Sequence, residues 1–236
     1  MEPADILSQL VARGRGITPA VLGELAAELD LSPADLLVIA GHPVPGELLP
    51  PRRDAKATKQ YASCVSHCDH AQLASLEEFV RSLPRLEAPG PFEQPASTYV
   101  TPAESGLAAV FNGLIRNRGF SISELPFLGL SRSTLLGMVS RWEPSPHRRF
   151  QLCATAGVLG WRLPELFAVF GEPYSPEFRP VVLCRHVGRV FRAGVFLTDA
   201  QLVECAREAL RLSASESRGA WRPVSQGFVG ECPDFS

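Results

Sequence analysis

The feature that most constrains the fold is a helical spacing of apolar residues along most of the chain. Apolar side chains recur at intervals of three and four, which places them on one face of an α-helix. No run alternates apolar and polar residues between turn signals, as a half-buried strand would. We therefore predict an all-α protein. The clearest stripes are Leu107, Val110, Phe111, Leu114 and Ile115, then Leu135, Met138, Val139 and Trp142, then Phe150, Cys153, Ala154 and Trp161, and then Leu163, Leu166, Phe167 and Phe170.

The chain also repeats itself at a distance of about 130 residues. Three short stretches recur in the same order and register, which predicts two helical halves that arose by duplication. Residues 1–12 would then align with 131–142, so the first half would lack the helices that precede that segment in the second. The matching stretches are Asp35-Leu36 with Glu165-Leu166, Gly41-His42-Pro43 with Gly171-Glu172-Pro173, and Ala71-Gln72-Leu73 with Ala200-Gln201-Leu202.

Charge is distributed unevenly between the two halves. The formal net charge is −2, but residues 1–51 carry −5, whereas residues 104–162 carry seven arginines against three glutamates. A locally basic segment in an acidic chain is where a polyanion would bind.

No apolar run approaches the roughly 18–20 residues of a membrane span, and the N-terminal stretch is acidic where a signal peptide would be basic. We expect a cytoplasmic protein with no membrane partner.

Three stretches of the second half carry a family resemblance. They are Leu114–Ser121 (LIRNRGFS), Gly129–Leu135 (GLSRSTL) and Leu163–Phe167 (LPELF). On these stretches the chain resembles the XRE-type helix-turn-helix family, which includes λ repressor and Cro. The resemblance implies a five-helix, λ-repressor-like unit at about 104–172 and a truncated, degenerate copy at about 1–51.

The resemblance also implies which residues contact DNA. In this motif the second of the two central helices, here 131–142, enters the major groove. Ser131 would cap that helix, and Arg132 would contact a base edge because arginine pairs bidentately with guanine. The other contacts expected on the helix are Ser133, Leu136, Ser140 and Arg141. The contacts expected with phosphates are Arg116, Arg118, Ser121, Ser123 and Arg148.

We therefore expect a bacterial transcriptional regulator that binds double-stranded DNA and lies on the nucleoid when bound. The apolar faces of the first half lack their partners in the truncated copy, so we expect a homodimer held mainly outside the DNA-reading unit, acting by itself or with another regulatory protein. The helices expected at Leu73–Leu83 and Leu202–Leu212 could instead cover these faces within one chain. The alternative is a protein-interaction scaffold built from degenerate repeats. The expected order is a truncated repeat with an appended helix (1–83), a linker (84–103), the helix-turn-helix unit (104–172), appended helices (173–212) and a loosely ordered tail (213–236).

One further cluster could bind metal. Cys64, His67 and Cys68 share a helix face, with His70 close by, and zinc accepts thiolate and imidazole ligands. Four ligands within seven residues can hardly close a tetrahedron, so we expect two core cysteines at a helix end and no metal. No nucleophile–base pair, phosphate-binding glycine loop or paired-carboxylate pattern is present. We expect no catalytic residues and no cofactor.

Overall fold

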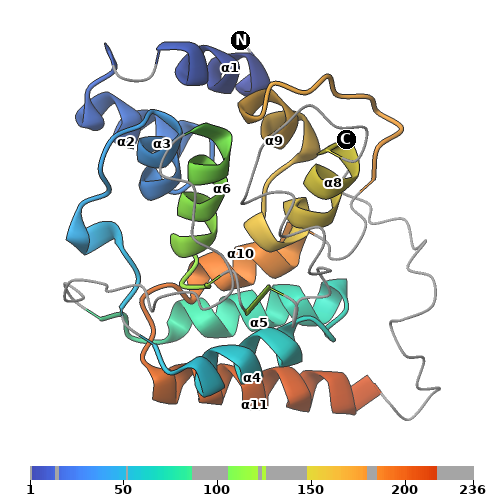
Figure 1. The fold of residues 1–236 in the computed structure, drawn as a ribbon. Coiled ribbons are helices and arrows are strands. Elements are labelled where there is room, and N and C mark those ends of the chain that lie inside the picture. Colours follow the sequence, from blue (N-terminus) through green and yellow to red (C-terminus); the bar gives the residue numbers. More distant parts are fainter. Residues whose placement is uncertain are drawn as a thin grey trace.

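The computed structural model describes residues 2–13, 16–51, 53–86, 106–121, 124–125, 148–179 and 185–216. Every regular element in these ranges is helical, which confirms the prediction of an all-α fold (Figure 1). The helices are α1 (Pro3–Arg13), α2 (Pro19–Glu28), α3 (Pro33–Ile39), the short 3-10 helix η2 (Gly46–Leu48), α4 (Ala55–Val65), α5 (His70–Ser82), α6 (Gly106–Arg116), α8 (Arg148–Leu159), α9 (Leu163–Val169), α10 (Arg185–Ala193) and α11 (Asp199–Glu216).

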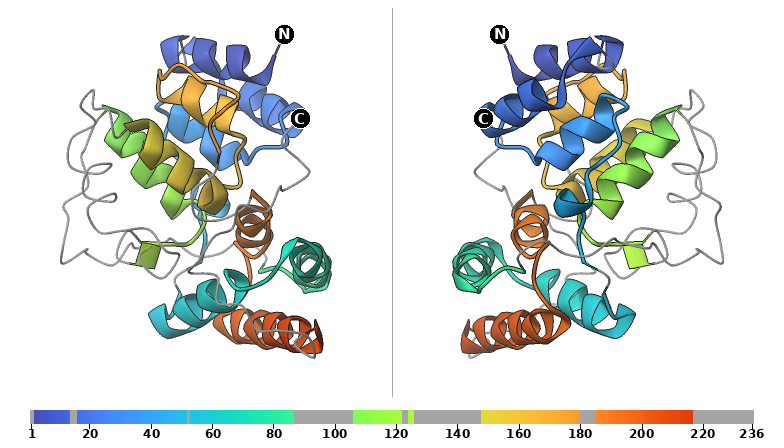
Figure 2. Two further views of the ribbon diagram at one scale, coloured as in Figure 1. Left: turned by 90° about the vertical axis from the view of Figure 1, so that its right-hand side faces the viewer. Right: turned by 90° about the vertical axis from the view of Figure 1, so that its left-hand side faces the viewer.

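The helices form two groups with α10 between them. Helices α1, α2, α3, α6, α8 and α9 lie on one side of α10, and α4, α5 and α11 lie on the other (Figures 1 and 2). Helix α10 packs on α8 in the first group and on α5 in the second. Each group therefore contains helices from both halves of the sequence.

Local sequence explains where several of these helices begin and end. Helices α2, α3 and α9 each carry a proline in the first turn, where its missing N–H costs no hydrogen bond. Helices α3 and α9 are each followed, two residues after their last residue, by a glycine (Gly41 and Gly171) with φ of 73° and 67°. This is the left-handed conformation that glycine adopts most easily. Taken singly, none of the described helices is long and apolar enough to cross a membrane, and α8 with α9 meets that description only as a pair bent by 118°.

The backbone of the turns repeats at the spacing that the sequence indicated. Asp30 and Gly160 are 130 positions apart and both have positive φ, 53° and 69°. The hydrogen bonds around α3 recur around α9 at the same spacing. The bond from Leu31 N to Ala26 O matches that from Trp161 N to Ala156 O, and the bond from His42 N to Leu37 O matches that from Glu172 N to Phe167 O.

The N-termini of α5 and α11 repeat as well, 129 positions apart. The Asp69 N–H donates to Gln72 Oε1 (3.0 Å), and the Gln72 N–H donates back to Asp69 Oδ1 (2.9 Å). Thr198 and Gln201 form the same reciprocal pair, at 2.9 Å and 3.3 Å. Such a capping box satisfies backbone donors that a helix leaves free. The second half thus repeats the first in its local geometry as well as in its sequence.

The two halves pack on each other reciprocally. Helix α4 packs on α11 as α10 packs on α5, and α1 packs on α9 as α6 packs on α3. The two capping glutamines also reach across, because Gln72 Nε2 donates to Leu212 O and Gln201 Nε2 donates to Pro84 O. The chain therefore resembles a dimer whose two subunits are joined, although the correspondence is incomplete, because α10 packs on α8 whereas α4 does not pack in the same way on α2.

This packing revises the correspondence of α1. Because α1 meets α9 as α6 meets α3, α1 occupies the place of α6, whereas sequence analysis had aligned residues 1–12 with 131–142. Both helices have the same length, and their bounds lie 103 positions apart. The last residue of each helix is the first of an Arg-Xaa-Arg-Gly sequence, at residues 13–16 and 116–119. Only residues 14–18 separate α1 from α2, whereas residues 117–147 separate α6 from α8. The longer connection therefore holds 26 more residues, which correspond to 122–147 if residues 14–18 match 117–121.

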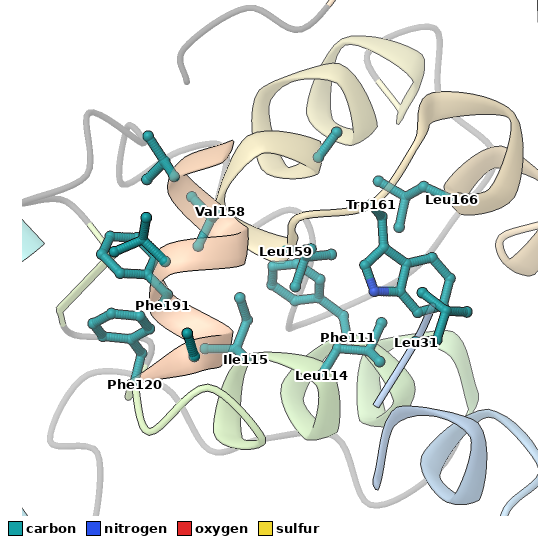
Figure 3. Packing of buried hydrophobic residues seen from close by; sticks show 14 of the residues in the cluster. Leu31, Phe111, Leu114, Ile115, Phe120, Val158, Leu159, Trp161, Leu166 and Phe191 are labelled. Atoms are coloured by element: carbon teal, nitrogen blue, oxygen red, sulfur yellow. The ribbon is translucent and has the colours of Figure 1, made fainter. Parts of the chain in front are cut away.

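A single buried cluster joins both halves. Figure 3 shows its centre, where Trp161 lies beside Leu31 of the first half, and Phe120 lies beside Phe191 of α10. The first-half residues Leu7, Leu10 and Leu22 are at most 1% exposed. Most of the apolar face of the first half is therefore covered within the chain, by α9 on α1 and by α3 on α2, while Val11 and Val21 stay exposed.

Candidate nucleic-acid interface

Most of the predicted DNA contacts lie outside the described residues. They are Ser123, Ser131, Arg132, Ser133, Leu136, Ser140 and Arg141. The structure places the remaining contacts on both sides of that segment. Arg116, Arg118 and Ser121 lie at the end of α6 or just after it, and Arg148 opens α8.

Arg118 is a core residue. Its side chain is 2% exposed, and its Nη1 and Nη2 donate to the two carboxylate oxygens of Asp35, at 3.1 Å and 2.9 Å. It also donates from Nε to Leu159 O (2.9 Å) and from Nη1 to Leu114 O (2.6 Å). The prediction that Arg118 contacts a phosphate is wrong, because its guanidinium is enclosed and engaged within the protein.

Asp35 is the centre of a buried polar network. Besides the two bonds from Arg118, its carboxylate accepts one from Asn117 Nδ2 (2.9 Å) and one from Trp161 Nε1 (3.2 Å), and the residue is fully buried. The network therefore joins α3 of the first half to the end of α6 and to the turn between α8 and α9. Residues 122–147 follow the end of α6 in the sequence and stop at the start of α8, the end of that helix opposite to Trp161.

Arg148 is also paired within the protein. Its Nη1 lies 2.8 Å from Glu172 Oε1, and its side chain is only 10% exposed. The prediction of a phosphate contact at Arg148 is wrong for the same reason as at Arg118. Its neighbour Arg149, which no sequence motif marks, is 49% exposed, and its Nε lies 3.6 Å from Glu172 Oε2. The Arg149 guanidinium carbon lies 6.0 Å from the ring centroid of Phe178.

Ser121 and Arg116 are tied to the end of α6. The backbone N–H and the hydroxyl of Ser121 donate to Glu124 Oε2, at 2.6 Å and 3.0 Å. The Glu124 N–H also donates back to Ser121 O (3.0 Å), so Ser121 is held in a tight turn with Glu124. Arg116 is half-buried, and desolvation lowers the pKa of its guanidinium. Neither residue presents a fully exposed group.

Arg53 lies between the turn before α11 and Gly119, which follows α6. It is not among the residues that the sequence indicated. Its Nη2 donates to Gly194 O (2.6 Å) and Val195 O (2.7 Å) in the turn before α11. Gly119, with φ of 73°, lies so close that a Cβ there would be 2.6 Å from Arg53 Nη1. Burial lowers the pKa of Arg53. No local motif marks this residue, because its partners lie far away in the sequence.

The four residues of the cysteine–histidine cluster diverge in the structure. Cys68 Sγ points to Ala209 O on α11 (3.8 Å), and burial raises the pKa of its thiol to about 12. The exposed His67 bonds through Nδ1 to Ser63 O, and the ring of His70 meets that of His186 at 4.1 Å. Across the described ranges, no group of three or more His, Cys, Asp or Glu residues has the geometry of a metal site.

We expect the purified protein to contain no stoichiometric zinc. A thiolate at Cys68 or Cys64 would have to form against a burial that raises the pKa of both thiols, and metal binding requires the deprotonated form. Elemental analysis of protein purified without chelator tests this expectation. One zinc per chain that is lost when Cys64 and Cys68 are both changed to serine would contradict it.

Comparison with known proteins gives no relative. No family model, no curated protein and no solved structure matches the chain.

Proposed function

We propose that the protein is a DNA-binding transcriptional regulator that reads duplex DNA with the segment around residues 131–142. The observation that supports this proposal is the position of that segment within the duplication. Residues 122–147 are the stretch of the second half without a counterpart in the first, and they contain the residues that the family resemblance assigns to base reading. The scaffold around them is duplicated, whereas the expected reading helix occurs once.

The ion pairs of the arginines limit how steeply DNA binding can depend on salt concentration. Arg118 and Arg148 are committed to carboxylates within the protein, so they cannot release counterions from DNA. The other five arginines of residues 104–162 remain as candidates, namely Arg116, Arg132, Arg141, Arg149 and Arg162. Since each neutralised phosphate adds roughly 0.9 to the salt slope of B-DNA binding, these arginines together account for a slope of log K against log salt no steeper than about −5.

Replacing Arg132 with alanine should weaken binding to the preferred duplex by about 1–3 kcal/mol, or roughly 5- to 150-fold, and remove its preference over other sequences. The preferred duplex is selected from random DNA, and binding is measured by fluorescence anisotropy across a salt series. Arg207→Ala is the matched control, because Arg207 is an exposed arginine of α11, which lies beyond α10 (Figure 1). Wild-type protein that retains no duplex at low salt would contradict the proposal.

A protein-interaction scaffold is the second candidate, and the same arginine pairs favour it. Besides Arg118 and Arg148, the exposed Arg149 and Arg162 lie within 4.0 Å of a carboxylate, at Glu172 and Glu165. The described part of the basic segment thus offers little uncompensated positive charge. The scaffold function predicts that Arg132→Ala and Arg207→Ala behave alike toward every duplex, at a level no higher than that of an unrelated acidic protein.

A further inference from the structure

We infer that one chain alone forms the DNA-binding unit, so that its target is a single asymmetric site instead of an inverted repeat. This inference rests on the proposed function. Regulators with one helix-turn-helix per chain usually pair into dimers that read two half-sites about one helical turn apart. In this protein the pairing takes place within the chain, and only one of the paired halves has the reading segment.

The internal pairing uses the surfaces that a second chain would need. A two-fold interface is self-complementary, because each subunit offers the same patch to the other. Here α4 with α11 and α5 with α10 form one such reciprocal contact, and α1 with α9 and α3 with α6 form another. Because these helix faces are buried between the two halves of one chain, they are not available to bind a second chain.

Buried hydrogen bonds also join the two halves of the chain. Tyr61 Oη donates to Val190 O (2.9 Å) with both residues buried, and Arg53 and Asp35 hold second-half groups as described above. The large apolar side chains that remain exposed in the described ranges come from six different segments, and no helix carries more than one of them. They are Val11, Val21, Leu86, Phe150, Tyr174 and Leu210.

The asymmetry follows from the segment at 122–147. In the first half only residues 14–18 connect α1 to α2, which leaves no room for a counterpart of the reading segment. A symmetric duplex would meet a reading helix at one half-site and none at the other. The sequence preference is therefore expected to lie on one side of the site only.

The experiment counts chains on the duplexes selected from random DNA, using native mass spectrometry and sedimentation equilibrium of the full-length protein. We expect one 25.6 kDa chain per duplex, selected sites without an inverted repeat, and free protein that stays monomeric into the tens of micromolar. The Arg132→Ala variant shows that the counted complex is the sequence-specific one. Two chains bound to an inverted repeat would overturn this inference and leave the proposed function standing. Selection that retains no duplex would overturn both.

Discussion

Replacing Asp35 with alanine is expected to destabilise the protein by about 3–5 kcal/mol, the cost of removing one partner of a buried ion pair. The carboxylate is fully buried and accepts bonds from Arg118, Asn117 and Trp161. Its loss would leave the Arg118 cation enclosed without a counter-charge and the indole N–H of Trp161 without an acceptor. Chemical unfolding followed by circular dichroism measures the change.

Two variants separate the ion pair from a general sensitivity to mutation. Asp5→Ala is the matched control, because Asp5 is exposed on α1, and it should change stability by less than about 0.5 kcal/mol. The double variant Asp35→Ala/Arg118→Met should recover part of the loss, since it removes the unpaired charge as well. A loss below about 1 kcal/mol for Asp35→Ala would show that the network does not hold the two halves together.

The pattern of helices could be read from the sequence because apolar spacing is a local signal. The spacing of about 130 between Gly41 and Gly171 was also visible, since each glycine follows the end of a helix in the left-handed conformation. The correspondence of α1 with α6 was missed because the 26 residues at 122–147 change the offset from 103 to 129. A comparison at one fixed offset does not detect both parts of such a repeat. The Arg-Xaa-Arg-Gly stretches at 13–16 and 116–119 were the signal that could have found it.

The roles of the arginines could not be read in the same way. Sequence shows that Arg118 is a cation in a basic segment, but its partner Asp35 lies 83 positions away. Whether a guanidinium faces solvent or a buried carboxylate depends on how the halves pack, and that packing is non-local. The same holds for Arg148 and Glu172, which are 24 positions apart. Local charge therefore overstated the positive surface that the protein can offer to DNA.

Three glycine-to-alanine variants should differ widely in stability because their Cβ atoms would meet different surroundings. At Gly188 the Cβ would overlap the backbone of Gly160 and lie 2.5 Å from Gly157 O. Backbone atoms of α8 cannot move aside singly, so α10 and α8 would have to separate, at a cost of about 3 kcal/mol or more. At Gly113 the Cβ would lie 2.6 Å from Val38 Cγ1, where a side chain can shift, so the cost should be about 1–3 kcal/mol.

Gly23 is the control that should gain stability. It lies inside α2, where an added Cβ would have no neighbouring atom within 4 Å, so alanine should stabilise the protein by about 0.5–1 kcal/mol through its better helix propensity. Thermal and urea unfolding of all three variants test the predicted order, with Gly23→Ala above wild type, Gly113→Ala below it and Gly188→Ala lowest. If Gly188→Ala yields no folded protein, the order of the other two still tests the packing. Gly188→Ala with wild-type stability would mean that α10 does not rest against α8, and the central position of α10 between the two groups of helices would be wrong.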